Sequence, residues 1–353
     1  MAPKRKPPLE LVHDSKGRTS KSHSVTSYDV AKMAGVSQSA VSRCFKPGAS
    51  VSKKMRERVM KAANELGYQP NAIARSLITR RSNLVAVILS DFTNLHYPEV
   101  LFELNSGFSR HGVHVLLFTL HRERDIDQII EQVFQYQVDG VVVATTLASE
   151  QIDNFEKRGI PLVFFNRSIQ DRLVSSVCCD QIGGERLLVN ALVNAGHKKF
   201  GIISGPDDSL VSIQRTRGAH DHLLELGLDN VPIAQGDYTY ASGQESTRKL
   251  MKKHNGDFDA LICANDVMAI GCMDVLRKEF GKAVPGDVSV VGFDGIAPAI
   301  WSGYNLVTIR QPVKQMSEAA VDMIMDRIEN PDTAAEMRVF SGAFQDGESA
   351  RLS

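Results

Sequence analysis

VTSYDVAKMAGVSQSAVSR, residues 25–43, is the stretch that decides the fold of the amino-terminal part of this chain. Thr26 and Asp29 have the spacing of a capping box, which predicts that a helix begins after Thr26. Gly35 suits the left-handed turn that ends a helix, and Ser37 is placed to cap a second one. The stretch therefore predicts two short helices joined by a tight turn.

Apolar side chains recur at helical spacing in the first helix and in a third predicted helix, which Ser52 caps and Gly67 ends. They are Val30, Met33 and Ala34 in the first, and Met55, Val59, Ala62, Ala63 and Leu66 in the third. Helix, glycine-containing turn, helix is the helix-turn-helix arrangement, whose second helix enters the major groove of DNA. We therefore expect residues 25–69 to form an all-α DNA-binding domain.

Side chains that suit base edges lie near the start of the second helix. They are Gln38, Ser39, Ser42 and Arg43. Their amide, hydroxyl and guanidinium groups match the donors and acceptors of the major groove, and Ala40 and Val41 are expected to face the other helices. The alternative is that Arg43 is an ordinary solvated charge on the helix surface and does not contact DNA.

Charge is divided unevenly along the chain, although the formal net charge is zero. Residues 1–81 hold 17 Lys and Arg against 5 Asp and Glu, and the other 272 residues hold 24 against 36. A basic segment on an acidic body is typical of a nucleic-acid-binding module joined to a domain with another ligand. Residues 1–24 lack apolar periodicity, which predicts a disordered basic arm.

The stretch PNAIARSLITRR, residues 70–81, is a short candidate helix that Asn71 can cap. About eight residues are too few to be helical alone in water. We therefore expect residues 70–82 to be a hinge helix and linker that becomes helical only when it docks against something.

From residue 84 onward, continuous apolar runs alternate with amphipathic helical segments. The runs are 84–89, 113–118, 141–144, 161–165, 200–203, 260–264 and 288–293. Strands buried on both faces have this composition, which predicts parallel sheets covered by helices. Ligands of such sheets bind beyond the carboxyl ends of the strands. Those ends carry Asp91, Asn94, Asn166, Arg167, Asn265, Asp266 and Asp294.

Several classes of protein are disfavoured by the sequence. No apolar run reaches the roughly 20 residues that cross a bilayer, and the polar start lacks the apolar core of a secretory signal. No G-x-S-x-G, H-E-x-x-H or P-loop motif is present, so we expect no catalytic residues, no metal and no cofactor. The five cysteines form no C-x-x-C pair, which favours reduced thiols in a cytosolic protein.

Further stretches complete a pattern that begins with residues 25–43. They are VSKKMRERVMKAANELGYQPNAIARSL (51–77), GHKKFGIISGP (196–206), RTRG (215–218), ANDVMAIG (264–271) and VSVVGFDG (288–295). In this order, over roughly residues 25–345, they resemble the lac repressor/galactose repressor family of bacterial transcription regulators. The resemblance implies an all-α helix-turn-helix head with a hinge helix, joined to an α/β two-lobed domain like that of periplasmic binding proteins.

The resemblance also implies how the chain meets DNA. It places operator contacts at Thr26, Tyr28, Ser37, Gln38, Ser39, Ser42, Arg43, Ser52, Asn71, Ala74 and Leu77. Leu77 would enter the minor groove and kink the duplex, the alternative being that it packs within the protein. Paired hinge helices imply a homodimer on a near-palindromic double-stranded operator, on the nucleoid of the bacterial cytosol. The carboxyl-terminal part of the chain, including the tail 346–353, lacks leucines at heptad spacing. We therefore expect no coiled coil that would join two dimers into a tetramer.

An effector site between the two lobes is the second implication. Lobe one is about 83–179 plus 313–338, and lobe two is about 180–311 plus 339–345. The implied lining is Asn94, His96, Tyr97, Phe165, Asn166, Arg215, Asn265, Asp294 and Trp301. Carboxylate, guanidinium and amide groups suit the hydroxyls of a polyol, and aromatic rings stack on sugar rings. Asn166 stands where the family often has Asp, which removes one negative charge and admits a more anionic effector.

These expectations combine into a sequence-specific DNA-binding transcriptional regulator, a repressor whose operator affinity is switched by a small sugar-like effector. One alternative is a corepressor-dependent regulator that responds to a purine or a sugar acid. A sugar-active enzyme and a sugar-binding protein without a DNA role are the others, and the basic head argues against both. Whether the effector is an inducer or a corepressor stays open.

Overall fold

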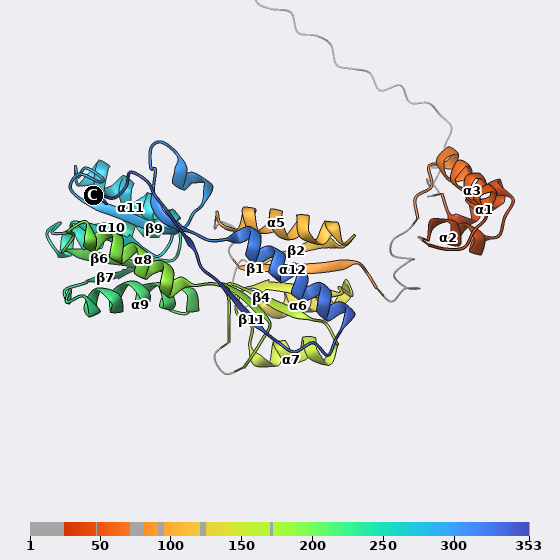
Figure 1. Ribbon diagram of the computed structural model, residues 1–353, viewed down its shortest axis with the longest axis horizontal. Helices are drawn as coiled ribbons and strands as arrows, with labels where there is room; N and C mark the ends of the chain where they lie inside the picture. Colours follow the sequence, from red (N-terminus) through yellow and green to blue (C-terminus); the bar gives the residue numbers. More distant parts are fainter. Residues whose placement is uncertain are drawn as a thin grey trace, which may run out of the picture. The chain divides into compact units, whose positions relative to one another are not determined.

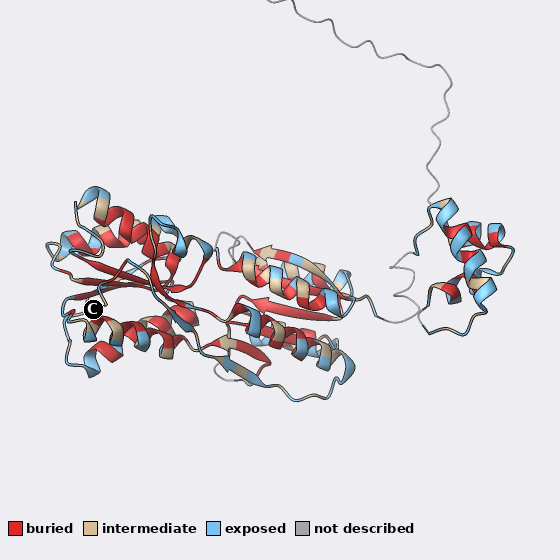
Figure 2. Cartoon of the chain, turned by 45° about the horizontal axis from the view of Figure 1, so that its top comes forward, coloured by how far each residue is buried: buried red, intermediate tan, exposed pale blue. Residues whose placement is uncertain are grey.

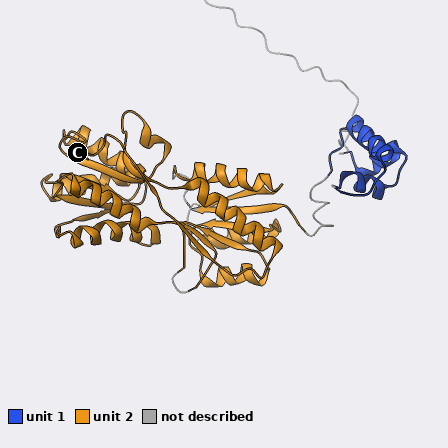
Figure 3. Cartoon of the chain, in the orientation of Figure 1, with its two compact units in different colours: residues 1–79 blue, residues 80–353 orange. Residues whose placement is uncertain are grey.

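We describe a computed structural model of the chain. It describes residues 25–46, 48–70, 81–90, 95–120, 125–169 and 172–352. The chain divides into two compact units, residues 1–79 and 80–353 (Figure 3). Several predictions fall outside the described residues. They are the arm 1–24, the hinge residues Asn71, Ala74 and Leu77, and the effector candidate Asn94.

The described part of the first unit contains three helices, α1 (Ser27–Ala34), α2 (Gln38–Phe45) and α3 (Lys53–Leu66). Each begins at a hydroxyl that accepts a hydrogen bond from a backbone N–H of the first turn. These caps are Thr26, Ser37 and Ser52. Gly35 and Gly67 end α1 and α3 in the left-handed conformation. The predicted helix-turn-helix is confirmed together with its local signals.

A small apolar core joins the three helices. It contains Val30, Ala31, Ala34, Val41, Cys44, Val59, Ala62 and Ala63. Met33 was expected on the buried side of α1 but is 50% exposed. Ala31 takes that place because positions 30, 31 and 34 share one side of the helix at 3.6 residues per turn.

The first sheet of the second unit has six strands. They are β1 (Leu84–Ser90), β2 (His114–Leu120), β3 (Gly140–Ala144), β4 (Leu162–Phe165), β5 (Ser176–Cys179) and β11 (Met337–Phe340). Their order is β11-β5-β4-β3-β1-β2, with every neighbouring pair parallel. Helices α5 (Tyr97–Arg110) and α12 (Val313–Glu329) cover one face, and α6 (Ile126–Gln135) and α7 (Ser149–Lys157) cover the other (Figure 1).

The second sheet repeats this plan. Its strands are β6 (Phe200–Ser204), β7 (Ile233–Gln235), β8 (Ala260–Cys263), β9 (Ser289–Asp294), β10 (Val307–Arg310) and β12 (Ala343–Gln345). The order is β12-β10-β9-β8-β6-β7, and only the pair β10–β12 is antiparallel. Helices α8 (Gln181–Asn194) and α9 (Leu210–Glu225) cover one face, and α10 (Tyr240–Lys253) and α11 (Asp266–Glu279) cover the other.

Burial on both faces explains the continuous apolar runs. In β1, Val85 and Val87 pack toward α5 and α12, whereas Ala86 and Ile88 pack toward α6 and α7. Successive side chains of a strand point to opposite faces, so a strand covered on both sides needs apolar residues throughout. Figure 2 shows these strands buried between the inner sides of the helices. All seven predicted runs contain a strand.

The chain passes between the two sheets three times, after β5, after β10 and between β11 and β12. The third passage lies between Phe340 and Ala343, a little beyond the lobe boundary expected after residue 338. None of the helices in the described residues is both long enough and apolar enough to cross a membrane.

Candidate functional site: a polar helix face and a cavity between two sheets

The second helix of the head, α2, presents a polar surface. Its exposed residues are Gln38, Ser39, Ser42 and Arg43, and its buried ones are Ala40, Val41 and Cys44. The Gln38 amide donates to the Ser27 hydroxyl at 3.3 Å. Arg43 forms no ion pair with any described carboxylate. The predicted base-reading side chains therefore share one solvent-facing side of α2.

The other DNA-contact candidates lie around the helix starts. Thr26, Ser37 and Ser52 are exposed caps, and Tyr28 in the first turn of α1 is 72% exposed. Helix starts carry partial positive charge and attract phosphate. Residues 25–70 hold eight Lys and Arg against three Asp and Glu, which adds to that attraction.

A cavity of about 80 Å³ lies beyond the carboxyl ends of strands from both sheets of the second unit. It is lined by His96, Tyr97, Phe165, Asn166, Arg167, Val211, Arg215, Tyr238, Asp294 and Gln311. Parallel sheets place ligands at this edge, where the strand order reverses. The structure thus brings six predicted effector residues to one place. They are His96, Tyr97, Phe165, Asn166, Arg215 and Asp294.

Arg215 of α9 is the most firmly held of these residues, with 3% of its surface exposed. Its Nε donates to Gln181 Oε1 at 2.7 Å, its Nη1 to the Ala264 carbonyl at 2.6 Å, and its Nη2 to Asp294 Oδ1 at 2.8 Å. The guanidinium also lies 3.9 Å from the centre of the Phe293 ring. A charge this deeply buried is stable only with such partners.

A chain of hydrogen bonds continues from Asp294 toward the first sheet. Gln311 Nε2 donates to Asp294 Oδ1 at 2.8 Å, and Asn166 Nδ2 donates to Gln311 Oε1 at 2.6 Å. Asn166 Oδ1 accepts from the Cys179 N–H at 2.9 Å. An aspartate at position 166 would lack the N–H that Gln311 receives. The Asn166 amide is therefore part of the link between the two sheets.

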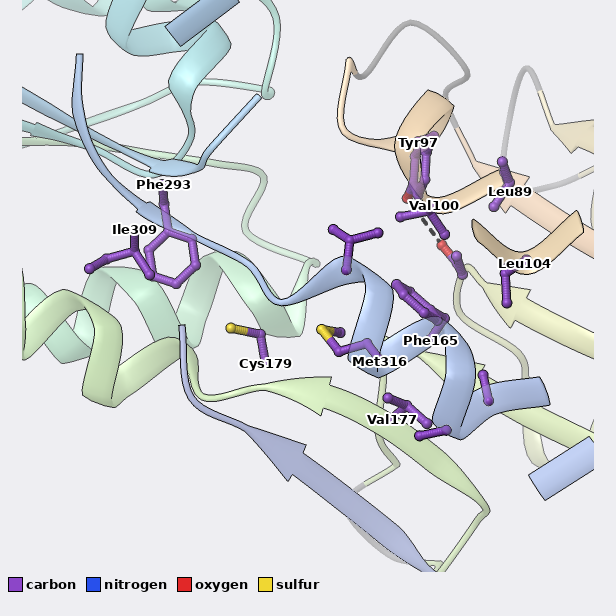
Figure 4. Close-up of a cluster of buried hydrophobic side chains, with 14 of the residues drawn as sticks. Leu89, Tyr97, Val100, Leu104, Phe165, Val177, Cys179, Phe293, Ile309 and Met316 are labelled. Carbon is purple, nitrogen blue, oxygen red and sulfur yellow. Dashed lines mark hydrogen bonds between the residues drawn. The ribbon is translucent and has the colours of Figure 1, made fainter. Parts of the chain in front are cut away.

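The first sheet contributes the aromatic side of the cavity. Tyr97 and Phe165 are both buried, and the Tyr97 hydroxyl donates to the Ala144 carbonyl at 3.4 Å (Figure 4). Burial lowers the pKa of His96, with Asp294 acting in the opposite direction. His96 is therefore neutral at pH 7, because an unperturbed histidine titrates near about 6.5.

Two predicted effector residues do not line this cavity. Asn265 is used as the cap of α11, since its Oδ1 accepts from the Met268 N–H at 2.9 Å and its Nδ2 donates to the Tyr238 carbonyl at 3.1 Å. Trp301 follows the short 3₁₀ helix η2 (Ala297–Ile300) and is 58% exposed.

Four lining residues were not in the predicted effector set: Arg167, which was named only among the strand ends, and Val211, Tyr238 and Gln311. Gln311 directly follows β10 and Tyr238 follows β7. Neither strand was predicted, because β7 has only three residues and Thr308 interrupts the apolar run of β10. Recognition of these strands would have drawn attention to the polar residues at their ends.

Two buried carboxyl groups lie behind the cavity. Asp266 Oδ2 accepts from the N–H groups of Gly295 and Ile296 at 2.7 and 2.9 Å, which fixes the loop after Asp294. Burial and the charge of Asp294 raise the pKa of Asp266 to about 7. Glu185 of α8 is 1% exposed, and neither carboxyl oxygen has a described hydrogen-bond partner. Burial raises the pKa of Glu185 to about 8.

Comparison with known families gives this arrangement its context. Residues 82–343 match the family described as periplasmic binding proteins and sugar binding domain of LacI family. Residues 26–71 match the bacterial regulatory proteins of the lacI family. The chain belongs to the LacI family. It is therefore a DNA-binding transcriptional regulator and not an enzyme, as the sequence predicted.

Curated relatives agree with this LacI-family assignment over most of their length. The HTH-type transcriptional regulator CelR of Thermobifida fusca is 31% identical, over 86% of this chain and 92% of CelR. The HTH-type transcriptional regulator AscG of Escherichia coli (strain K12) is 32% identical, over 90% of this chain and 96% of AscG.

Solved structures of the LacI family agree as well. The lac repressor dimer bound to operator and the anti-inducer ONPF has a TM-score of 0.84 at 26% identity, covering 93% of this chain and 99% of its own. A complex of the transcriptional regulator CelR with cellobiose has a TM-score of 0.70 at 29% identity, covering 92% of this chain and 100% of its own. The predicted two-part fold is confirmed.

Proposed function

We propose that this LacI-family regulator acts as a homodimeric repressor on a near-palindromic operator, and that a small sugar-like effector in the cavity between the sheets switches its operator affinity. The observation that carries this proposal is the buried pair of Arg215 and Asp294 at the edge of a cavity lined from both sheets. The protein would act in the cytosol, on the nucleoid.

The head supplies the DNA side of the proposal. Gln38, Ser39 and Arg43 would read base edges from the exposed side of α2. Thr26, Tyr28, Ser37, Ser42 and Ser52 would contact the backbone and flanking positions, and Asn71, Ala74 and Leu77 would contact the operator centre. The exposure of the described candidates supports this assignment. The lac repressor has been solved as a dimer on its operator, which supports the same state here.

The cavity supplies the effector side. Both described hydrogen bonds of Asp294 use Oδ1, so Oδ2 can accept ligand hydroxyls. Arg215 has five N–H bonds, and its three described hydrogen bonds leave others for a ligand. Tyr97 and Phe165 would pack on the apolar side of a sugar ring, with His96 and Asn166 beside them. A sugar is the ligand that this mixture of groups fits best.

The hydrogen bonds that link the two sheets through Asp294, Gln311 and Asn166 would couple effector binding to operator affinity. A ligand that takes over the hydrogen bonds of Gln311 and Asp294 changes what holds the first sheet to the second. It then favours one arrangement of the two lobes over the other. A coupling free energy of about 1–3 kcal/mol corresponds to roughly 5–150-fold regulation. An inducer lowers operator affinity, whereas a corepressor raises it.

Operator titrations test the proposal. Genomic fragments retained by the full chain supply the operator, and its affinity is measured by fluorescence anisotropy with and without sugars. A chain lacking residues 1–81 should lose operator binding and keep sugar binding. A sugar that binds in calorimetry yet never changes operator affinity would refute the switch. Retention of DNA only when a metabolite is added would establish the corepressor alternative.

A further inference from the structure

Arg167, the second residue after β4, has no ionic partner among the described residues. It is half-buried and lines both the 80 Å³ cavity and a neighbouring cavity of about 120 Å³. Its Nη1 donates to the Asn166 carbonyl at 2.8 Å. In contrast, Arg215 is bonded directly to a carboxylate. A half-buried guanidinium whose only described hydrogen-bond acceptor is a neutral carbonyl favours a negatively charged partner.

The described acidic residues near Arg167 are engaged with other groups. Asp294 is bonded to Arg215 at 2.8 Å, and Glu99 to Arg310 at 3.2 Å. Asp180 accepts from the Gly183 N–H at 2.8 Å as the cap of α8. None of these carboxylates lies within ion-pair distance of Arg167. The positive charge of Arg167 is therefore not compensated within the described cavity.

Two further titratable groups near the cavity carry no charge at neutral pH, and Asp266, whose pKa is about 7, lies behind the cavity and is not part of its lining. His96 is neutral because burial lowers its pKa. Glu185, behind Arg215, is protonated because burial raises its pKa to about 8. Asn166 supplies a neutral amide. With Arg215 and Asp294 offsetting each other, the described lining of the 80 Å³ cavity has one net positive charge.

We propose that the effector is an anionic monosaccharide, whose carboxylate or phosphate pairs with Arg167 while its hydroxyls bind Asp294 and Arg215. This inference rests on the proposed effector site and names the class of ligand for it. A guanidinium matches either anion with two parallel N–H···O bonds, which are shorter and stronger than neutral ones.

Neutral and anionic sugars with the same ring separate the effect of ligand charge from the effect of ligand shape. Calorimetry of the full chain at fixed ionic strength compares D-galactose with D-galacturonate and D-galactose 6-phosphate, and D-glucose with its own uronate and 6-phosphate. We expect at least one anionic sugar to bind about tenfold or more tightly than its parent hexose. The uronate and phosphate arms identify which anion the site prefers. Equal affinity for a hexose and its acids would overturn the inference.

Variants assign the effect to Arg167. In Arg167→Met, which keeps an unbranched apolar stem but removes the charge, the anionic sugar should lose about tenfold in affinity while the parent hexose stays within about twofold. Arg110→Met is the control, because Arg110 is exposed on α5 and its ion pair with Glu318 is long, at 4.0 Å. This variant should change the affinity for neither the hexose nor the acid. Equal losses for hexose and acid in Arg167→Met would assign Arg167 a structural role instead.

A second measurement compares an open-chain sugar acid with a neutral open-chain polyol. Thermal unfolding of the full chain is followed in D-gluconate and in D-sorbitol at matched ionic strength. Gluconate should raise the melting temperature of the wild type but not of Arg167→Met, and sorbitol should not distinguish them. A neutral sugar that binds and moves operator affinity, without any anion effect, refutes this inference and leaves the proposed function standing. If no ligand binds and gluconate has no effect, both fail.

Discussion

The polar face of α2 and the cavity between the sheets hold their polar side chains in opposite ways. On α2, the candidate DNA-reading residues are exposed and rest on a small core to which they contribute nothing. In the cavity, Arg215, Asp294, Gln311 and Asn166 are buried and bonded to one another. The exposed side chains of α2 are free to change conformation when they meet DNA. The arrangement in the cavity makes the ligand-binding groups part of what holds the protein together.

This difference predicts how substitutions behave in each region. A change on α2 should alter operator affinity and leave stability intact. A change in the cavity should alter both effector binding and stability, because each group removed leaves a buried partner unsatisfied.

Arg215→Ala should have the largest effect. It leaves Asp294 and Gln181 buried without their donor, which costs about 3–5 kcal/mol when one member of a buried pair is removed. Effector binding should be lost, and operator affinity of the folded protein should remain. Urea unfolding followed by circular dichroism measures the loss. Arg186→Ala is the control, because its ion pair with Glu225 is exposed. Equal destabilisation by the two variants would contradict the contrast.

Glu185→Gln tests the buried carboxyl behind the cavity. The pKa of Glu185 is raised from 4.5 to about 8. The folded chain therefore retains a proton that the unfolded chain loses, and stability falls as pH rises from about 4.5 to about 8. The glutamine variant cannot ionise. Its advantage in free energy of unfolding should be near zero at about pH 4 and roughly 5 kcal/mol at about pH 9. A difference independent of pH would show that Glu185 is ionised in the fold.

Arg43→Ala tests the α2 face. Loss of one guanidinium contact to a base should weaken operator binding by about 1–3 kcal/mol, measured by anisotropy. The free energy of unfolding should stay within about 0.5 kcal/mol, as for other surface changes. Lys61→Ala is the matched control, because Lys61 is exposed on α3 near Glu65. If Lys61→Ala weakened specific binding as much, general charge and not α2 would account for the effect.

Thr26→Ala should have the smallest effect. It removes the hydroxyl of the capping box at the start of α1, which is expected to lower the stability of the head by about 1 kcal/mol. Ser42→Ala removes an exposed hydroxyl within α2 that caps no helix and serves as the control. Thermal unfolding of the head reports both. An equal effect of the two substitutions would mean that the cap contributes nothing.

Local signals in the sequence predicted much of the fold. The caps at Thr26, Ser37 and Ser52 act on residues within one helical turn, so the sequence shows them directly. Seven of the twelve strands in the described residues were found for the same reason, because each contains its own run of apolar residues. The edge strands β7, β11 and β12 were not predicted, since they are short and carry exposed side chains. The inner strands β5 and β10 were also missed, because each has only four residues and Ser176 or Thr308 shortens its apolar run.

The cavity was only partly predictable, because its contacts join distant parts of the chain. Arg215 was found through a family motif within α9, and Asp294 through a family motif at the end of β9. The hydrogen bond from Asn166 to Gln311 spans 145 residues, and no local pattern indicates it. Asn265 is the opposite case, since its position at a strand end predicted an effector contact. Its side chain instead caps the next helix, α11.

The central claim is that a ligand in the cavity controls the DNA affinity of the head. The direct measurement is an operator titration by anisotropy, with and without the effector, for the wild type and Asp294→Asn. The wild type should change affinity by roughly 5–150-fold when the effector is added. Asp294→Asn should bind the operator as the wild type does and show no response. An unchanged response in Asp294→Asn would place the effector outside this cavity and contradict the account.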